Sequence, residues 1–300
     1  MRKVIARIKG GLGNQLFCYA AARRLAIANN AELILDNVSG FSRDFKYRRK
    51  FQLDGFNITA QLAKPSERFE PMERIRRGLV KFNERKKPFM QRKYIEEEVI
   101  GFDERILEIK LLESDVVIDG LWQSAKYFSD VEDNLRCDLR FKPQYDLKNL
   151  DALKWIKKKQ ATAVHVRWFG HAGSDQNIPY SYYHSAILKI IQRIDDPYFA
   201  IFSDCPDKAI EILGLPQNRL LKVDWNMRDG GELADMWLMS HCAHSIMSNS
   251  TFSWWGTWLG TKCENRLVFF PRSKGGELPP WSRAWDYEGQ MLSSWSPILV

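Results

Sequence analysis

The sequence predicts an α/β protein of two domains, and three observations support this class. Its 300 residues suffice for two domains that each bury a core of their own. Residues 4–36 read as a strand, a glycine loop, a helix and a second strand, the opening of a βαβ unit. Residues 151–259 alternate helices with short apolar strands, the pattern of a second parallel sheet. Residues 141–149 separate the halves, so we expect domains at 1–145 and 146–300.

Composition places the chain among globular proteins, with 45% hydrophobic and 27% charged residues. A net charge of +8 at pH 7 favours a polyanion, an acidic membrane surface or a phosphorylated substrate as partner. Five cysteines without C-x-x-C spacing argue against a disulfide framework and a zinc site. The charged N-terminus does not resemble a signal peptide, and no run of about twenty apolar residues is present. We therefore expect a cytoplasmic protein, with peripheral contact to the acidic inner membrane face.

The first half opens with an expected strand at 4–8, a turn at 9–14, a helix at 15–28 and a strand at 32–35. Gly11, Gly13 and Asn14 in the turn allow backbone N–H groups to approach an anion at a helix N-terminus. A dinucleotide-binding fingerprint requires a third glycine, and Leu16 stands in its place. A nicotinamide-dependent oxidoreductase therefore stays an alternative only.

Residues 64–93 form a strongly basic stretch, with eleven lysines and arginines against four glutamates. Ile75, Leu79 and Phe82 recur at helical spacing, which predicts a basic amphipathic helix of the kind that lies on a membrane. The alternative is that the basic face of this helix is exposed to solvent and has no binding role. A nucleic-acid-binding module is a further alternative, but the stretch lacks the interleaved stacking aromatics of such modules.

The remaining helices and strands are predicted from apolar runs and from the glycine, proline and polar residues that end them. A strand at 116–118 leads into residues 119–128, which place Trp122, Gln123 and Tyr127 near a strand end. The second half is expected to hold helices at 151–159, 181–194, 232–241 and 252–259, a helix that starts at residue 206, and strands at 163–169, 198–202 and 245–247. The proline-rich tail, with late tryptophans at 281, 285 and 295, reads as a loop and a packing segment.

Polar side chains lie at the ends of three of the expected strands in the second half. They are His165 and Arg167, Ser203 and Asp204, and the run Ser248, Asn249, Ser250 and Thr251. Because parallel strands end at one edge of a sheet, we expect these groups to converge there. An arginine fork and free N–H groups suit phosphate oxygens, and a carboxylate suits a ribose hydroxyl or a base N–H. The pattern predicts a nucleoside-diphosphate site. No D-x-D pair for a metal-bound nucleotide sugar is present.

Five segments in order resemble the α-1,2-fucosyltransferases, glycosyltransferase family eleven. They are G-G-L-G-N-Q-L-F-C-Y-A at 10–20, G-L-W-Q-S-A-K-Y-F at 120–128, H-V-R at 165–167, F-S-D at 202–204 and S-N-S-T-F-S-W-W-G-T-W-L at 248–259. The resemblance implies a GT-B-like α/β fold, with two Rossmann-type domains facing a central cleft. The N-terminal domain would face the acceptor, and the C-terminal domain would bind the GDP-sugar.

The same resemblance implies the reaction. GDP-fucose is the expected donor, inversion at the anomeric carbon the expected course, and neither a metal nor another cofactor is expected. The expected acceptor is a galactose-containing oligosaccharide or a lipid-linked glycan of a cell-surface polysaccharide, fucosylated at O2 of a terminal galactose. No nucleic acid partner is expected.

Site residues follow from the resemblance and from the strand ends. Arg167 is expected to hold the diphosphate. His165 is a candidate general base with strand capping as its alternative, and Asn14 is a candidate contact to the sugar or the acceptor hydroxyl, with a turn role as its alternative. The expected donor-binding residues are Gly11, Gly13, Asn14, His165, Arg167, Ser203, Asp204, Ser248, Asn249, Ser250, Thr251 and Phe252. The expected acceptor-binding residues are Trp122, Gln123 and Tyr127.

One departure from the family pattern concerns the donor. The family usually reads H-x-R-R-G-D, whereas this chain has Trp168, Phe169 and Gly170 after the first arginine. An arginine and a carboxylate are therefore absent beside the expected diphosphate site. The same fold acting on another GDP-deoxysugar is accordingly an alternative to GDP-fucose.

Overall fold

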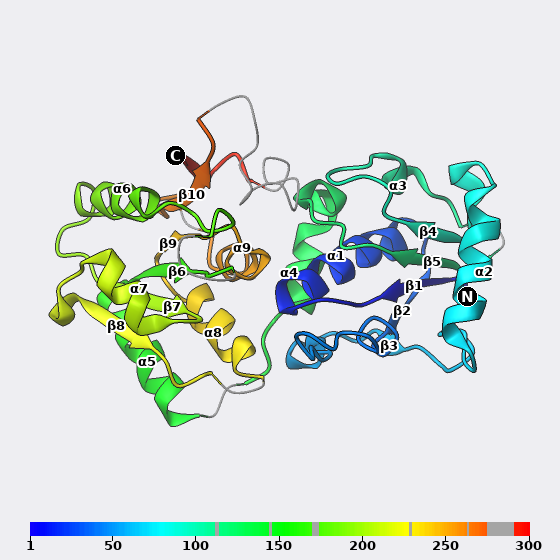
Figure 1. Cartoon of the computed structure of the whole chain (residues 1–300), viewed down its shortest axis with the longest axis horizontal. Coiled ribbons are helices and arrows are strands. Elements are labelled where there is room, and N and C mark those ends of the chain that lie inside the picture. Colours follow the sequence, from blue (N-terminus) through cyan, green and yellow to red (C-terminus); the bar gives the residue numbers. More distant parts are fainter. Residues whose placement is uncertain (112–113, 144–145, 170–173, 228–229, 263, 275–290) are drawn as a thin grey trace. The chain divides into compact units, whose positions relative to one another are not determined.

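The computed structural model describes residues 1–111, 114–143, 146–169, 174–227, 230–262, 264–274 and 291–300. Its contacts group the chain into two compact units (Figure 1). The N-terminal unit takes in Met1–Phe141, and the C-terminal unit begins with Lys142 and includes Met291–Val300. The boundary that we expected after residue 145 falls on residues 144–145, outside the described residues. Each unit is an α/β structure built on a parallel sheet, which confirms the predicted class.

The sheet of the N-terminal unit has five parallel strands in the order β3-β2-β1-β5-β4. The buried apolar run of β1 lies at its centre, with Val4 opposite Leu33 on one side and Val116 on the other. The strands are β1 (Lys3–Arg7), β2 (Glu32–Asp36), β3 (Gln61–Leu62), β4 (Tyr94–Glu96) and β5 (Val116–Asp119). Because β1 and β5 are neighbours while β2 continues on the far side of β1, the strand order reverses between β1 and β5.

The helices of the N-terminal unit are α1 (Leu12–Ala28), α2 (Glu73–Arg85), α3 (Arg105–Glu108) and α4 (Glu132–Asp138). The alanine-rich α1 is buried along most of its length, because small side chains allow close packing. It begins three residues earlier than expected, with Gly11 as its N-cap residue. Gly13 and Asn14 therefore belong to the first helical turn and not to the preceding loop, which corrects the expected glycine loop. Short 3₁₀ turns lie at Leu53–Gly55, Phe89–Gln91, Ala125–Tyr127 and Ser129–Val131.

A buried carboxylate ties the carboxyl edge of this sheet together. Asp119, at the end of β5, is 4% exposed and accepts from Lys9 at 2.9 Å, Lys81 at 2.7 Å, Arg7 at 3.2 Å and the Tyr94 hydroxyl at 2.8 Å. Burial alone would raise the pKa of Asp119, but the cations around it hold that pKa well below its usual range. This network joins β1, β4, β5 and α2.

The sheet of the C-terminal unit has six parallel strands in the order β11-β10-β9-β6-β7-β8. All five residues of the central β6 are buried. The strands are β6 (Thr162–Val166), β7 (Phe199–Ser203), β8 (Leu220–Val223), β9 (His244–Ile246), β10 (Val268–Arg272) and β11 (Ser296–Leu299). The tail is therefore partly strand and not only loop: the apolar run at the start of β10 is buried, and Pro271 is accommodated opposite Ile298. Trp281 and Trp285 lie outside the described residues, whereas Trp295 packs on Trp254 at 5.6 Å.

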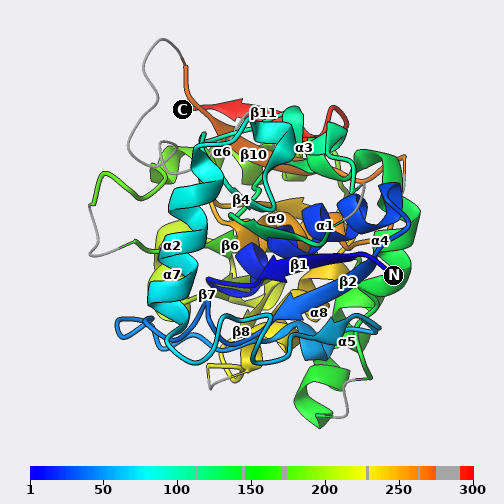
Figure 2. The ribbon, with the colours of Figure 1, turned by 90° about the vertical axis from the view of Figure 1, so that its right-hand side faces the viewer.

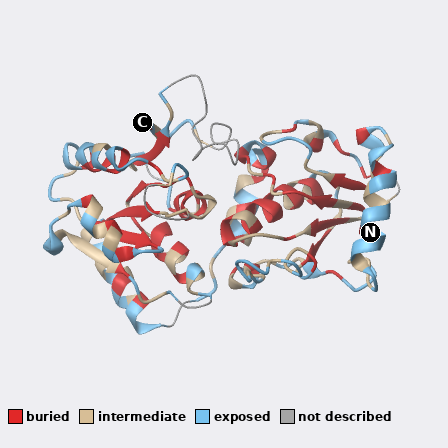
Figure 3. Cartoon of the chain, in the orientation of Figure 1, coloured by how far each residue is buried: buried red, intermediate tan, exposed pale blue. Residues whose placement is uncertain are grey.

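The helices of the C-terminal unit are α5 (Leu147–Lys159), α6 (Tyr180–Ile191), α7 (Pro206–Leu213), α8 (Gly231–Ser240) and α9 (Thr251–Trp258), with a 3₁₀ turn at Gln217–Arg219. α5 begins earlier than expected because the Asp146 carboxylate caps it, accepting from the Asn149 backbone at 3.0 Å. Buried residues concentrate in the strands and in the helix faces that cover them (Figure 3). Within the described ranges, no helix combines the length and apolarity needed to span a bilayer.

Candidate functional site

The three polar strand ends of the C-terminal unit meet at one edge of its sheet, as the sequence predicts. β6 lies between β9 and β7, and all three run parallel. Val166 is paired with Ser203 and Val164 with Ile246, so the residues that follow each strand emerge side by side. This carboxyl edge is where open α/β sheets bind their ligands.

Arg167 follows β6 directly and forms an ion pair with Asp204, which follows β7. Its guanidinium nitrogen lies 3.1 Å from the carboxylate, and the two side chains are 39% and 31% exposed. The other oxygen of Asp204 accepts from the backbone N–H of Trp168 at 3.2 Å. Asp204 therefore orients the guanidinium while both groups stay accessible to solvent. An exposed pair of this kind contributes little to stability, so it costs little to rearrange around an anion.

His165 is held inside the sheet edge by hydroxyl groups. It is 5% exposed, and its Nδ1 lies 2.7 Å from the Ser248 hydroxyl, which in turn lies 3.3 Å from that of Ser253. Burial and the charge of Arg167 lower the pKa of His165 to about 3. The imidazole is therefore neutral near pH 7 and a poor proton acceptor. Its place favours the strand-capping alternative: His165 links the end of β6 to the turn before α9.

The turn after β9 delivers the N-terminus of α9 to the same edge. Ser250 caps this helix, its hydroxyl accepting from the Phe252 backbone at 3.3 Å, and Thr251 is the first helical residue. Asn249 donates to the Gln176 carbonyl at 3.2 Å, and the Phe252 ring lies 5.6 Å from that of His165. Buried tryptophans anchor the helix behind the turn, namely Trp254, Trp255 and Trp258. A rigid helix N-terminus presents backbone N–H groups and a partial positive charge to an anion.

Two further residues at this edge have structural partners. The Ser203 hydroxyl accepts from the Cys205 backbone at 3.1 Å and so starts the turn before α7. Trp168 is half-buried against the Tyr180 ring at 5.9 Å, with the Lys208 ammonium 4.9 Å from its own ring. Trp168 thus packs toward α6 and α7. Gly170 lies outside the described residues.

In the N-terminal unit, the glycine turn before α1 is held by a side chain that the sequence analysis missed. Gln15 is fully buried, donates to the Gly10 carbonyl at 2.9 Å and to the Lys50 carbonyl at 2.8 Å, and accepts from the Gln52 backbone at 2.9 Å. A glutamine without any exposed surface has to satisfy its amide internally, which explains these bonds. Its position in the G-G-L-G-N-Q segment was the available signal, but periodicity alone did not distinguish it from its helical neighbours.

The expected acceptor residues divide into two buried aromatics and one accessible amide. Trp122 and Tyr127 are each 1% exposed and pack edge to face at 5.8 Å, so the structure argues against direct contact of these rings with an acceptor. The sequence placed both rings near a strand end. In the structure Trp122 has a left-handed backbone conformation, with φ +52°, and both rings are enclosed by the protein. Gln123 is half-buried and donates to Asn14 at 2.9 Å, which brings two of the expected site residues together.

Comparison with known proteins supports the family resemblance. The family model described as Glycosyl transferase family 11 matches residues 3–271. An α-1,2-colitosyltransferase of Escherichia coli is 28% identical over 274 residues, covering 86% of this chain and 88% of the relative. The O-antigen biosynthesis glycosyltransferase WbnK of Escherichia coli is 30% identical over 291 residues, covering 88% of this chain and 92% of the relative.

A solved structure of another protein supports the fold. It is FUT1 of Arabidopsis thaliana in complex with GDP, 12% identical, with a TM-score of 0.53 over 89% of this chain and 70% of that one. Similarity at this level concerns the fold alone. Together with the two parallel sheets, it confirms the expected GT-B-like class of α/β protein.

Proposed function

The chain belongs to glycosyl transferase family 11 and is a glycosyltransferase, and on this premise we propose that it transfers L-fucose from GDP-β-L-fucose to a glycan, with inversion and without a metal. The proposed acceptor atom is O2 of a terminal galactose. The C-terminal unit would bind the donor and the N-terminal unit the acceptor. The observation that carries the proposal is Arg167, half-exposed at the carboxyl edge beside the N-terminus of α9.

In the proposed reaction the acceptor hydroxyl oxygen forms a bond to the anomeric carbon while the bond from that carbon to the diphosphate oxygen breaks. The electron pair of the broken bond leaves with GDP, and the hydroxyl proton passes to a base or to solvent. Negative charge grows on the diphosphate, so fixed positive groups beside it lower the barrier. Arg167 and the backbone N–H groups at the start of α9 supply them, and neither needs a metal ion.

Within this proposal the neighbours of Arg167 have distinct roles. Asp204 orients the guanidinium and offers its carboxylate to a ribose hydroxyl or a base N–H, as its accessible position allows. His165 acts as a positioning residue, because a buried imidazole with a pKa of about 3 is a weak base. It aligns Ser248, and through Ser248 the turn that leads to Ser250 and Thr251.

The alternative donor is another GDP-deoxysugar. The relative named as an α-1,2-colitosyltransferase supports this second candidate, since its name records transfer of a different sugar. The departure at Trp168 and Phe169 supports it as well, because the family's second arginine is missing beside the expected diphosphate.

The decisive experiment offers the purified protein GDP-fucose and GDP-mannose with galactose-terminated oligosaccharides, and follows the products by mass and by NMR of the new linkage. The proposal expects an α-linked fucose on O2 of galactose, with activity retained in excess chelator. Loss of activity in chelator that magnesium or manganese restores would contradict metal independence.

A thermal-shift panel separates the remaining classes. GDP is expected to raise the melting temperature, because a ligand that binds only the native state stabilises it in proportion to its affinity. UDP, NAD and a short oligonucleotide are expected to leave it unchanged. A shift with NAD alone would favour the oxidoreductase, and one with the oligonucleotide alone would favour a nucleic-acid-binding protein.

A further inference from the structure

Helix α2 exposes its apolar side chains to solvent. Ile75, Leu79 and Phe82 are 60%, 60% and 61% exposed, and they recur at i, i+4 and i+7, so they form one stripe along the helix. Met72, just before the helix, is 63% exposed. A surface helix ordinarily turns such a stripe toward the core. Here the stripe, defined as Ile75, Leu79 and Phe82, is left without cover by the described residues.

The side chains that α2 buries instead are charged: Arg77 and, near the end of the helix, Glu84. Arg77 is 8% exposed and lies 3.7 Å from Asp36 at the end of β2, and 3.9 Å from Glu73. Lys81 reaches Asp119 at the end of β5. Figure 2 shows α2 upright across the edge at which these strands end. Ionic contacts at the sheet edge thus hold the helix in place and leave its apolar residues facing outward.

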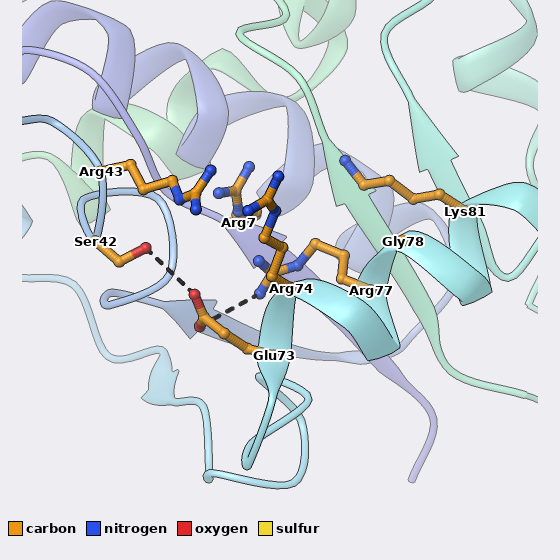
Figure 4. A pocket seen from close by; sticks show the side chains of 8 residues that line it. All are labelled: Arg7, Ser42, Arg43, Glu73, Arg74, Arg77, Gly78 and Lys81. Carbon is orange, nitrogen blue, oxygen red and sulfur yellow. Dashed lines mark hydrogen bonds and ion pairs between the residues drawn. The ribbon is translucent and has the colours of Figure 1, made fainter.

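A cationic pocket of about 200 Å³ lies between α2 and the chain after β2 (Figure 4). It is lined by Arg7, Ser42, Arg43, Glu73, Arg74, Arg77, Gly78 and Lys81. In Figure 4 the guanidinium groups of Arg7, Arg43 and Arg74 point into the same space, and the Lys81 ammonium points toward them. Five cationic side chains therefore surround this space against one carboxylate.

Two of these arginines form no ion pair within the part of the chain that the structure describes. Across those residues, the guanidinium groups of Arg43 and Arg74 have no hydrogen-bond or ion-pair partner, whereas Arg7 and Lys81 are bound to Asp119. The pocket lies at the carboxyl edge of the sheet beside β1, where the strand order reverses, and ligands of open α/β sheets bind at such points. Planar guanidinium groups match phosphate oxygens in geometry and charge. The charge and geometry of these side chains thus suit a phosphate group.

The pocket and the stripe are parts of one surface. Arg74, Arg77, Gly78 and Lys81 line the pocket at i, i+3, i+4 and i+7, and the stripe begins one residue later, about 100° around the same helix. A ligand with a phosphate beside apolar chains would use both. The N-terminal unit also carries most of the protein's charge excess, with 27 lysines and arginines against 21 acidic residues in Met1–Phe141.

We propose that α2 docks the protein on an anionic phospholipid surface, with a headgroup phosphate in the arginine pocket and the stripe among the acyl chains. Charge complementarity selects this occupant. A second copy of the chain would bring like charges together, a nucleic acid would leave the stripe in water, and a soluble phosphate would use the pocket alone. A basic helix with an apolar face lies in the bilayer interface and responds to both features.

The test measures co-sedimentation of the full chain with vesicles of phosphatidylcholine, with and without phosphatidylglycerol. We expect the partition coefficient to be at least about tenfold higher with phosphatidylglycerol, and to fall as salt is raised. Equal binding to both vesicles, or binding to neither, would overturn the proposal.

Three variants divide the surface. Arg43→Gln with Arg74→Gln removes the two uncommitted arginines, Leu79→Gln with Phe82→Gln removes the stripe, and Gly78→Gln obstructs the pocket without changing any charge. A Cβ at Gly78 would meet nothing within 4 Å, so this last variant is expected to fold. Each variant is expected to lower binding to phosphatidylglycerol vesicles by about tenfold. Binding that depends on the arginines but survives the stripe and Gly78 variants would overturn the proposal in favour of diffuse charge attraction.

Matched controls come from the C-terminal unit. Lys157→Gln with Lys158→Gln removes two exposed cations of α5, and Leu188→Gln with Ile191→Gln removes two exposed apolar side chains of α6. Both are expected to keep vesicle binding within about twofold, and a tenfold loss in either would overturn the assignment to α2. Glycerol phosphate at the same phosphate concentration is the soluble competitor. It is expected to compete only in part, because it fills the pocket but offers nothing to the stripe. Complete displacement of the protein from vesicles would show a soluble phosphate ligand and overturn the membrane proposal, as would a change of oligomeric state in the stripe variant.

Discussion

The carboxyl edges of the two sheets differ in how they use charge. At the edge of the N-terminal unit, Arg7, Lys9 and Lys81 surround the buried carboxylate of Asp119, so opposite charges are locked together with little access to water. At the edge of the C-terminal unit, Arg167 faces Asp204, and both are accessible. The described polar groups beside this pair include hydroxyls, backbone N–H groups and the neutral imidazole of His165.

The difference distinguishes charges that hold the fold together from charges that stay available to a ligand, in two units built on the same kind of sheet. A buried, mutually compensated network becomes unfavourable when one member is lost, because the others stay desolvated. An exposed pair contributes little to stability and exchanges partners readily. Variants of the Asp119 network are therefore expected to lose stability, and variants of the Arg167–Asp204 pair to lose activity while staying folded.

The largest expected effect is that of Asp119→Asn. Removing this carboxylate leaves three cations close together without their counter-charge, and breaking a buried ion pair in this way costs about 3–5 kcal/mol. Urea unfolding monitored by circular dichroism would measure it. Asp130→Asn is the matched control. The Asp130 side chain is 54% exposed, so its ion pair with Arg24 contributes about 1 kcal/mol or less to stability. Equal losses in the two variants would remove the distinction between the edges.

Arg167→Lys is the counterpart at the second edge. A lysine keeps the charge but not the fork of donors, so we expect the transfer rate to fall by about tenfold to a hundredfold, equivalent to about 1.5–3 kcal/mol. The melting temperature is expected to stay unchanged. Arg219→Lys is the control, because this arginine pairs with Asp196 at the opposite edge of the same sheet. Near-normal turnover of folded Arg167→Lys would show that Arg167 does not hold the diphosphate.

The neutral His165 predicts a pH effect on stability. Its pKa is lowered to about 3 in the folded protein by burial and by Arg167, against about 6.5 when unfolded. Below pH 6.5 the unfolded chain binds a proton that the folded chain does not, so stability falls as pH falls. The loss from this group between pH 6.5 and 5 is about 2 kcal/mol. Unfolding of His165→Gln followed over this interval should show a smaller decline than the parent, and parallel declines would contradict the assignment.

The smallest expected effect concerns the turn before α1. Gly10 has φ +81°, and a Cβ there would lie 2.9 Å from the Asn14 side chain, so Gly10→Ala is expected to cost about 1–2 kcal/mol. Gly11→Ala is the matched control, because Gly11 has φ −72° and its nearest neighbour would be Arg49 at 3.7 Å. Chemical denaturation of both variants compares them directly. A larger loss at Gly11 would mean that space, and not the backbone angle, limits this turn.

Local patterns predicted much of the fold and the identity of the candidate site. Apolar runs identified β1, β2, β5, β6, β7 and β9, because a buried strand needs a continuous apolar segment. Polar residues after β6, β7 and β9 were expected at one edge, and parallel pairing places them there. The five segments that resemble the family were recognisable in the sequence as well. None of these inferences requires knowledge of what packs against a given side chain.

The sequence by itself thus determined the α/β class, the family and the convergence of Arg167, Asp204 and Ser248. Only the tertiary structure decided which side chains are buried. The helical spacing of Ile75, Leu79 and Phe82 is the same whether the helix buries or exposes this face. The ionic contacts of Arg77 with Asp36 and of Lys81 with Asp119 turn the three side chains toward solvent. Trp122 and Tyr127 were placed near a strand end, and their neighbours enclose them. Periodicity is a property of a short segment and can be read from the sequence. Burial depends on contacts with residues far along the chain, and a single sequence does not indicate which residues those are.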